Sequence, residues 1–193
     1  MYLFFDTETT GLPNNWNAPV TDTKNWPRMV QLAFLLYQPD GTLLESENYI
    51  IKPEGFKIPL DVSRVHGITT ERAISEGHEL NNVLSKFQTV FLKAKTLVAH
   101  NMDFDEKILG CEFYRTTRQD PLTAKQKFCT MKNSAIIDFC AIPPIRYGSY
   151  KWPKLPELHL KLFGTTINEA HNASMDIQAT ARCFFELKKR NII

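Results

Sequence analysis

The sequence predicts an α/β fold, a mixed sheet with helices on both faces. Two observations indicate it. Three apolar or alternating runs near the N-terminus have the length and pattern of strands, at residues 2–5, 30–38 and 43–52. After them, helical patterns alternate with one further apolar run, and a strand meander followed by alternating helices and strands is the order expected of such a layered domain. We expect one domain over residues 1–193.

Each expected element has its own local signal. The turn between the second and third strands is Pro-Asp-Gly-Thr at residues 39–42, which suits antiparallel neighbours. A short apolar run at residues 96–100 is the remaining strand. Helical spacing of apolar residues covers four ranges: 80–92, 103–114, 156–163 and 173–189. Two stretches rich in Pro, Asn or Gly together with aromatics are expected to be loops at the rim of a site: 13–26 and 142–156.

Composition and charge exclude several classes of protein. The net charge is +2, from 23 basic and 21 acidic residues, so any affinity for nucleic acid must come from a local arrangement of charge. The four cysteines show no Cys-x-x-Cys spacing, which argues against a zinc site or a disulfide framework. No signal segment precedes Asp6 and no apolar run reaches about 18 residues, so we expect a cytoplasmic protein without membrane contact.

Asp6 and Glu8 are the first candidates for chemistry. Side chains of a strand alternate between its faces, so these two share a face at the end of the first strand. Two like charges at this separation raise each other's pKa, and a proton or a cation usually neutralises them. Hard oxygen ligands on one face favour Mg²⁺ or Mn²⁺. An Asp and a Glu where a strand meets a Thr-Gly turn also fit turn and capping roles, so the pair alone leaves both readings open.

Two later helices carry further acids. Asn101 offers a cap to the helix that follows it, and Asp105 lies in the first turn of that helix, where an acid also complements the helix dipole. Asp176 borders the buried stripe of the last helix about one turn in, and His171 comes just before that helix. A single His at such a position is commonly a cap or a surface group. None of these residues identifies a site by itself.

Together these segments resemble the DEDDh family of 3′-5′ exonucleases, which includes the proofreading subunit of bacterial DNA polymerase III, ribonuclease T and the Trex-type nucleases. Three separated blocks stand in the family's order: Asp6-x-Glu8-Thr9-Thr10-Gly11, then His100-Asn101-x-x-Phe104-Asp105, then His171-x-Ala173-x-x-Asp176. The spacing between the last His and the last Asp marks the "h" subtype. All five signature residues are present, and the resemblance covers nearly the whole chain.

The resemblance implies a ribonuclease H-like fold and a two-metal hydrolysis of phosphodiester bonds. The substrate would be nucleic acid with a free 3′ end, for which we expect single-stranded DNA, and the products would be 5′-mononucleotides. Asp6, Glu8 and Asp176 would hold one Mg²⁺ or Mn²⁺, and Asp6 and Asp105 a second, about 4 Å away. His171 would take a proton from the attacking water, since an ordinary His has a pKa of about 6.5.

Substrate contacts are expected beside the first two acids. By resemblance, Thr9, Thr10 and Leu12 would hold and wedge the terminal 3′ nucleotide. His66 and Phe104 would shape the same pocket, although Phe104 fits an ordinary helix core equally well.

The aromatic residues of the two expected loops allow two interpretations of the role of these loops. Residues 147–154 interleave aromatics and cations, as does a surface that binds single strands by base stacking. A loop that is clasped against the body of the domain can have the same composition. Trp16 and Trp26 carry the same ambiguity.

Other functions remain open. The chain could be an RNA-directed exoribonuclease, because discrimination rests on contacts to the 2′-OH that no motif announces. It could be a catalytically silent nucleic-acid-binding or polymerase-docking module, although loss of activity normally shows as a lost acid and all four are present. A polymerase or a second copy of the chain could be its partner. No partner-binding tail extends past Ile193, which favours an independent exonuclease.

Overall fold

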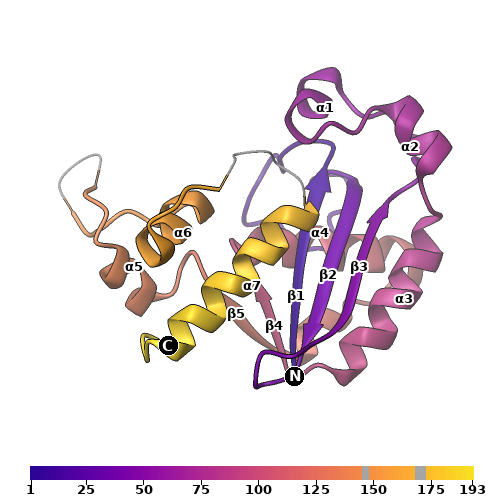
Figure 1. Cartoon of the computed structure of the whole chain (residues 1–193). Helices are drawn as coiled ribbons and strands as arrows, with labels where there is room; N and C mark the ends of the chain where they lie inside the picture. The colour runs from indigo at the N-terminus through magenta and orange to yellow at the C-terminus, as the bar shows by residue number, and fades with distance from the viewer. Residues whose placement is uncertain (145–147, 168–172) are drawn as a thin grey trace.

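The computed structural model describes residues 1–144, 148–167 and 173–193. Within these ranges the chain forms a five-stranded mixed sheet with the order β3-β2-β1-β4-β5 (Figure 1). β1, β2 and β3 are antiparallel neighbours, whereas β4 and β5 run parallel to β1. The strands span Tyr2–Thr9 (β1), Met29–Tyr37 (β2), Leu43–Ile50 (β3), Thr96–Ala99 (β4) and Gln126–Cys129 (β5).

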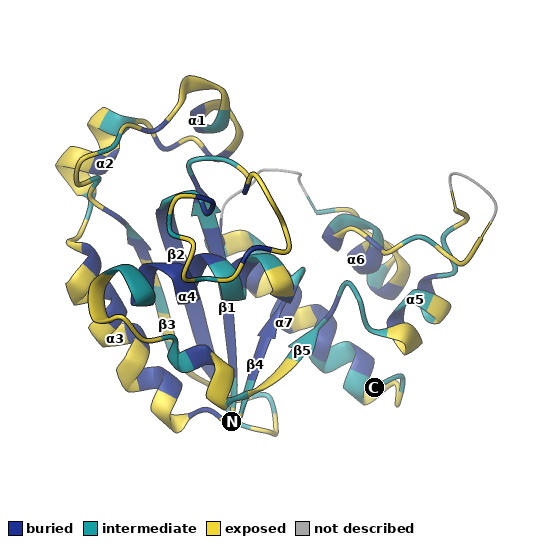
Figure 2. Ribbon diagram, turned by 180° about the vertical axis from the view of Figure 1, so that it is seen from behind, coloured by how far each residue is buried: buried dark blue, intermediate teal, exposed yellow. Residues whose placement is uncertain are grey.

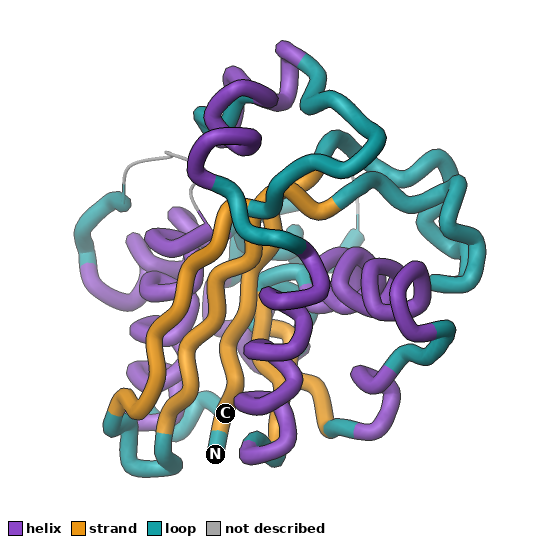
Figure 3. Tube along the Cα trace, turned by 90° about the vertical axis from the view of Figure 1, so that its right-hand side faces the viewer, coloured by secondary structure: helices purple, strands orange, loops and turns teal. Residues whose placement is uncertain are grey.

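Helices cover both faces of this sheet, as predicted. α7 packs on one face, α3 and α4 pack on the other, and α5 and α6 pack against α7 (Figures 2 and 3). In the described part of the chain, no helix is long and apolar enough to cross a membrane. The helices span Leu60–His66 (α1), Thr70–Glu76 (α2), Leu80–Lys93 (α3), Met102–Thr117 (α4), Ser134–Cys140 (α5), Leu155–Phe163 (α6) and Ala173–Lys189 (α7), with a 3₁₀ turn at Pro121–Ala124.

The central strand β1 contributes to a hydrophobic core on each face. Leu3 and Phe5 pack with the side chains of α3 and α4, whereas Phe4 packs with those of α7. The rings of Phe4 and Phe184 meet edge to face, with centroids 5.3 Å apart. A strand covered on both faces needs apolar side chains in both directions, which explains the continuous apolar run at the start of β1. β1 therefore lies between two helical layers.

β1 is longer than the sequence predicts. The strand expected at residues 2–5 continues to Thr9 because β2 keeps pairing with it; Glu8 is opposite Gln31, and the register shifts only beyond that pair. Asp6 and Glu8 therefore lie inside the strand rather than at its end.

Several short elements have no counterpart in the prediction. α1, α2 and α5 have seven residues each, and β5 has four. Elements this short show too little periodicity to separate them from loops.

The start of α4 also differs from the prediction. Asn101 directly precedes the helix but has a left-handed backbone conformation, with φ at 74°, and makes no capping hydrogen bond through its side chain to the described residues. Asn enters this conformation more readily than most residues, so the sequence places the boundary well although the capping mechanism is wrong.

Candidate active site

Asp6, Glu8 and Asp176 meet at the C-terminal half of β1. The two strand residues share a face, and Asp176 comes from the first turn of α7, which packs on that face. One carboxylate oxygen from each residue lies within 4.8 Å of those from the other two. All three residues are partly exposed. The result is a group of three acids around one point that solvent can reach.

Asp105 reaches the same part of β1 from α4, in the opposite helical layer. Its Oδ1 accepts hydrogen bonds from the backbone N–H and the hydroxyl of Thr7, at 2.9 and 2.8 Å, and only 3% of the residue is exposed. Thr7 stands between Asp6 and Glu8 in the strand, so alternation points its side chain to the other face. Thr7 thus orients the fourth acid. Thr7 was not among the residues expected at the site, although strand alternation places its side chain on the face that α4 covers.

Burial raises the pKa of three of the four acids, and neighbouring acids add to the rise for Asp6 and Glu8. Burial raises the pKa of Asp6 well above its usual value, and the charges of Asp105, Glu8 and Asp176 add to the rise. Burial also raises the pKa of Glu8 to about 7, with further contributions from Asp176 and Asp105. Burial raises the pKa of Asp105 to about 7, although the two hydrogen bonds from Thr7 lower it. At neutral pH the cluster therefore retains protons unless a cation replaces them.

The donor set fits a hard divalent cation. The cluster that could hold a metal in the described residues consists of carboxylates alone. Mg²⁺ and Mn²⁺ prefer such oxygen ligands, and a bound cation inverts the local pKa preference by favouring ionised acids. The negative charges that repel one another in the metal-free cluster would thus attract a divalent cation and be stabilised by it.

The expected base cannot be placed in this geometry. His171 lies outside the described residues, as does Tyr147, the first residue of the aromatic segment 147–154. Asp176 follows in the first turn of α7 and is described.

The residues expected to hold the 3′ nucleotide lie where β1 ends. The hydroxyl of Thr9 donates to the carbonyl of Gly11 at 2.7 Å, and the hydroxyl of Thr10 accepts from the backbone N–H of Arg28 at 3.0 Å. Both hydroxyls therefore shape the loop after β1. Leu12, the apolar residue among these three, is 71% exposed.

His66 and Phe104 are placed differently from each other. His66 is buried, its Nδ1 accepts from the backbone N–H of Ile68 at 3.1 Å, and its Nε2 has no hydrogen-bond partner among the described residues. Burial lowers the pKa of His66, so a neutral imidazole is favoured. Phe104 is half-buried: it packs against the core and lies 5.7 Å from the ring of Trp16. The two readings of Phe104, core and pocket wall, are both compatible with this position.

A buried carboxylate holds the loop that carries these contacts. Glu112 of α4 is fully buried, and its Oε1 accepts from Arg28 Nε and from the backbone N–H of Met29, each at 2.9 Å. Arg115, at 2.9 Å from the same oxygen, also donates to backbone carbonyls of the loop. Through Arg28 this network reaches Thr10. A Glu in mid-helix carries no sequence signal of this role, because its partners come from a distant loop.

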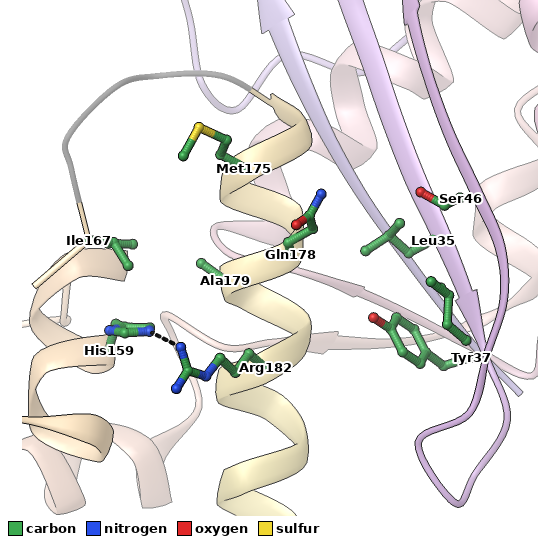
Figure 4. Close-up of a pocket in the computed structure, with 10 residues that line it drawn as sticks. Leu35, Tyr37, Ser46, His159, Ile167, Met175, Gln178, Ala179 and Arg182 are labelled. Atoms are coloured by element: carbon green, nitrogen blue, oxygen red, sulfur yellow. Dashed lines mark hydrogen bonds between the residues drawn. The ribbon is translucent and has the colours of Figure 1, made fainter. Parts of the chain in front are cut away.

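A hollow of about 530 Å³ lies along the exposed side of α7 and is separate from the acids (Figure 4). Arg182 and His159 approach within 3.4 Å on one side of it, and Tyr37 and Ser46 border it on the strand side. Its described lining contains none of the four acids.

Sequence comparison relates the chain to an exonuclease family and to DNA polymerase III proteins. Residues 3–184 match the protein family RNase T, described as exonuclease. The DNA polymerase III subunit epsilon of Treponema pallidum is 27% identical over 183 residues, covering 93% of this chain and 73% of that protein. A PolC-type DNA polymerase III of Mycoplasmopsis pulmonis is 31% identical over 112 residues, covering 58% of this chain and 7% of that protein. The chain thus spans only a small part of the PolC-type relatives.

Structural comparison confirms the fold. Exonuclease I of E. coli in complex with a dA16 oligonucleotide superposes with a TM-score of 0.76 at 22% identity, over 98% of this chain and 41% of that one. The zinc-bound form of an E. coli exonuclease I complex with single-stranded DNA gives a TM-score of 0.72 at 23% identity, over 98% of this chain and 40% of that one. The ribonuclease H-like fold predicted from the sequence is the fold observed.

Proposed function

The chain belongs to the RNase T exonuclease family, a family of 3′-5′ exonucleases, and from this membership we propose that residues 1–193 form one exonuclease domain that degrades single-stranded DNA. It removes 5′-mononucleotides from the 3′ end by hydrolysis that depends on two divalent cations. The observation that supports this most strongly is the group of acids at β1. One oxygen from each of three carboxylates lies within 4.8 Å of the other two, and Thr7 holds a fourth carboxylate beside them.

The four acids would hold two divalent cations. Asp6, Glu8 and Asp176 would hold one, and Asp6 and Asp105 would hold the other. Mg²⁺ or Mn²⁺ bound there supplies charge that stabilises the attacking and leaving oxygens of the phosphodiester. Thr7 keeps the Asp105 carboxylate turned toward β1 through its two hydrogen bonds. His171 accepts a proton from the attacking water, a role that rests on the family resemblance.

The terminal nucleotide is held beside β1. Leu12 is exposed and close in sequence to the acids, so its side chain can wedge against the terminal base. Thr9 and Thr10 contribute by shaping the loop, since their hydroxyls are engaged within it. Single-stranded DNA as the substrate is supported by the exonuclease I complexes, which contain such strands, and by relatives that are DNA polymerase III proteins.

Association with a polymerase is a second candidate. One observation favours it. The relatives include a DNA polymerase III subunit and a PolC-type polymerase, and the matched part is only 7% of the PolC-type protein. Such a role would leave the exonuclease chemistry unchanged.

Oligonucleotides labelled at the 5′ end test the proposal directly. With Mg²⁺ or Mn²⁺ we expect a descending ladder from single-stranded DNA, no cleavage in excess chelator, and protection by a 3′-phosphate. Matched RNA should be degraded more slowly. Glu54→Gln, at an exposed acid outside the cluster, serves as the control variant and should behave as wild type. Cleavage of circular single strands at a comparable rate would identify an endonuclease, and full activity in chelator would exclude the metal-dependent mechanism.

A further inference from the structure

Trp152 and Lys132 form an exposed aromatic and cationic pair beside the first turn of α4. Trp152 is 53% exposed, and the Lys132 ammonium lies 4.7 Å from the centroid of its ring. The same ammonium pairs with the carboxylate of Asp103 at 2.5 Å. Asp103 lies in the first turn of α4, two residues before Asp105. The pair is therefore attached to the helix that supplies the fourth acid.

The sheet topology places this pair at the edge where the acids lie. β4 and β5 run parallel to β1, so the residues that follow all three strands emerge at one edge. Lys132 follows β5, and His100, which follows β4, bonds to Thr130 at 2.9 Å. Pro153 is buried, and its backbone raises the pKa of the His100 imidazole, against the larger lowering by burial. Trp152, the neighbour of Pro153, is thus anchored at this edge.

A second exposed tryptophan, Trp16, packs against the first turn of α4. Trp16 belongs to the loop between β1 and β2, and β2 and β4 flank β1 on opposite sides. Its ring, in a residue that is 46% exposed, packs 5.7 Å from Phe104, and its carbonyl accepts from Lys107 at 2.7 Å. Trp26 differs: it is 3% exposed and its Nε1 donates to a loop carbonyl, so it is a structural residue.

An enzyme that removes the 3′-terminal nucleotide contacts the rest of its substrate only on the 5′ side of the bond that is cut. That strand must leave the site along neighbouring surface, and exposed aromatic rings next to cations bind single strands because every base has a face that can stack. Trp152 fits this description better than a residue of a clasped loop, since about half of its surface is open to solvent while the adjacent Pro153 is buried.

We propose that Trp152, backed by Lys132, is a stacking platform for a base of the single-stranded DNA substrate on the 5′ side of the bond that is cut. The ammonium occupies one face of the indole and the base takes the other. Asp103 holds the ammonium in place. This inference rests on the proposed function, since it extends the path of the same substrate.

Substrate length distinguishes the platform from the catalytic centre. We compare a dinucleotide with an oligomer of about twelve nucleotides, a length within the usual range of single-strand sites. For Trp152→Ala we expect KM for the oligomer to rise about 5- to 150-fold, the range given by alanine substitution at stacked bases, with kcat unchanged. KM and kcat for the dinucleotide should not change. Trp152→Phe should restore most of the loss, because a phenyl ring still stacks.

Two further variants complete the test. Lys132→Gln keeps the ring and removes the cation, so KM for the oligomer should rise about 2- to 5-fold. Leu160→Ala removes a comparably exposed apolar side chain from α6 and should change nothing. Equal KM values of wild type and Trp152→Ala for the oligomer, or parallel losses on both substrates, would overturn the platform while the exonuclease stands. If wild type cleaves neither substrate, the platform falls together with the proposed function.

Discussion

Replacing Glu8 by Gln should stabilise the metal-free protein at alkaline pH. The folded protein raises the pKa of Glu8 from 4.5 to about 7, first through burial and then through Asp176 and Asp105. The pKa of Glu8 is higher in the folded protein than in the unfolded chain. At pH values between these two pKa values, the folded protein therefore binds more protons than the unfolded chain. The stability that protonated Glu8 contributes is therefore fully present below about pH 4.5 and is lost as the pH rises through about 7. A Gln carries no charge and avoids this loss.

The size of the effect follows from the same shift. At about 1.36 kcal/mol for each unit of pKa, ionised Glu8 costs the folded protein about 3 kcal/mol at pH 8. For a chain of this length, 1 kcal/mol moves the melting temperature by about 2 to 4 °C. In chelator at pH 8, Glu8→Gln should thus melt about 6 to 12 °C above wild type. At pH 4.5 the two proteins should melt together, since both side chains are then largely neutral.

Thermal unfolding by circular dichroism across this pH range measures the difference. Glu54→Gln is the matched control, because Glu54 is exposed and outside the cluster; its melting temperature should follow wild type at every pH. Adding Mg²⁺ or Mn²⁺ should raise the melting temperature of wild type more than that of Glu8→Gln, since a ligand that binds the folded state stabilises it. Equal melting temperatures of Glu8→Gln and wild type in chelator at pH 8 would refute the raised pKa of Glu8 in the folded protein.

Three further predictions concern individual residues of the site. Asp6→Asn should lower kcat more than it weakens substrate binding, because Asp6 would contact both cations; steady-state kinetics should show this split, and a change in KM alone would contradict it. His171→Ala should lose about 10² to 10⁴ in rate, with the acidic limb of the pH-rate profile altered and the melting temperature unchanged; unchanged turnover would exclude His171 as the base. Thr7→Val removes the hydroxyl that donates to Asp105 and should cost about 1 to 3 kcal/mol in denaturant unfolding at pH 8; Thr7→Ser should restore it, and equal stabilities of the Val and Ser variants would show that the hydroxyl does not support Asp105.

Long elements were predictable because their signal is local. The pattern at residues 173–189 matches α7 at both ends, since its apolar stripe repeats over several turns. β1 was predicted too short, because its polar second half pairs with β2 and no local pattern reveals the partner strand. The 7-residue helices and the 4-residue β5 depend on their neighbours for stability and have no pattern of their own.

The loops divide according to tertiary contacts. Trp16, Trp26 and Trp152 look alike in the sequence, yet one is buried and two are exposed near α4. Burial depends on which surface each loop meets, and that is decided by distant residues such as Arg115 and His100.

By itself the sequence determined which acids face together along β1, because strand alternation is a property of the backbone. It also determined the family, because the motif blocks occur in one order along the chain. Only the tertiary structure decided that Asp105 is held by Thr7, 98 residues away, from the helical layer opposite Asp176. The parallel connection through β4 and α4 brings these groups to one edge of the sheet. Contacts between layers depend on how whole elements pack, and no local pattern encodes them.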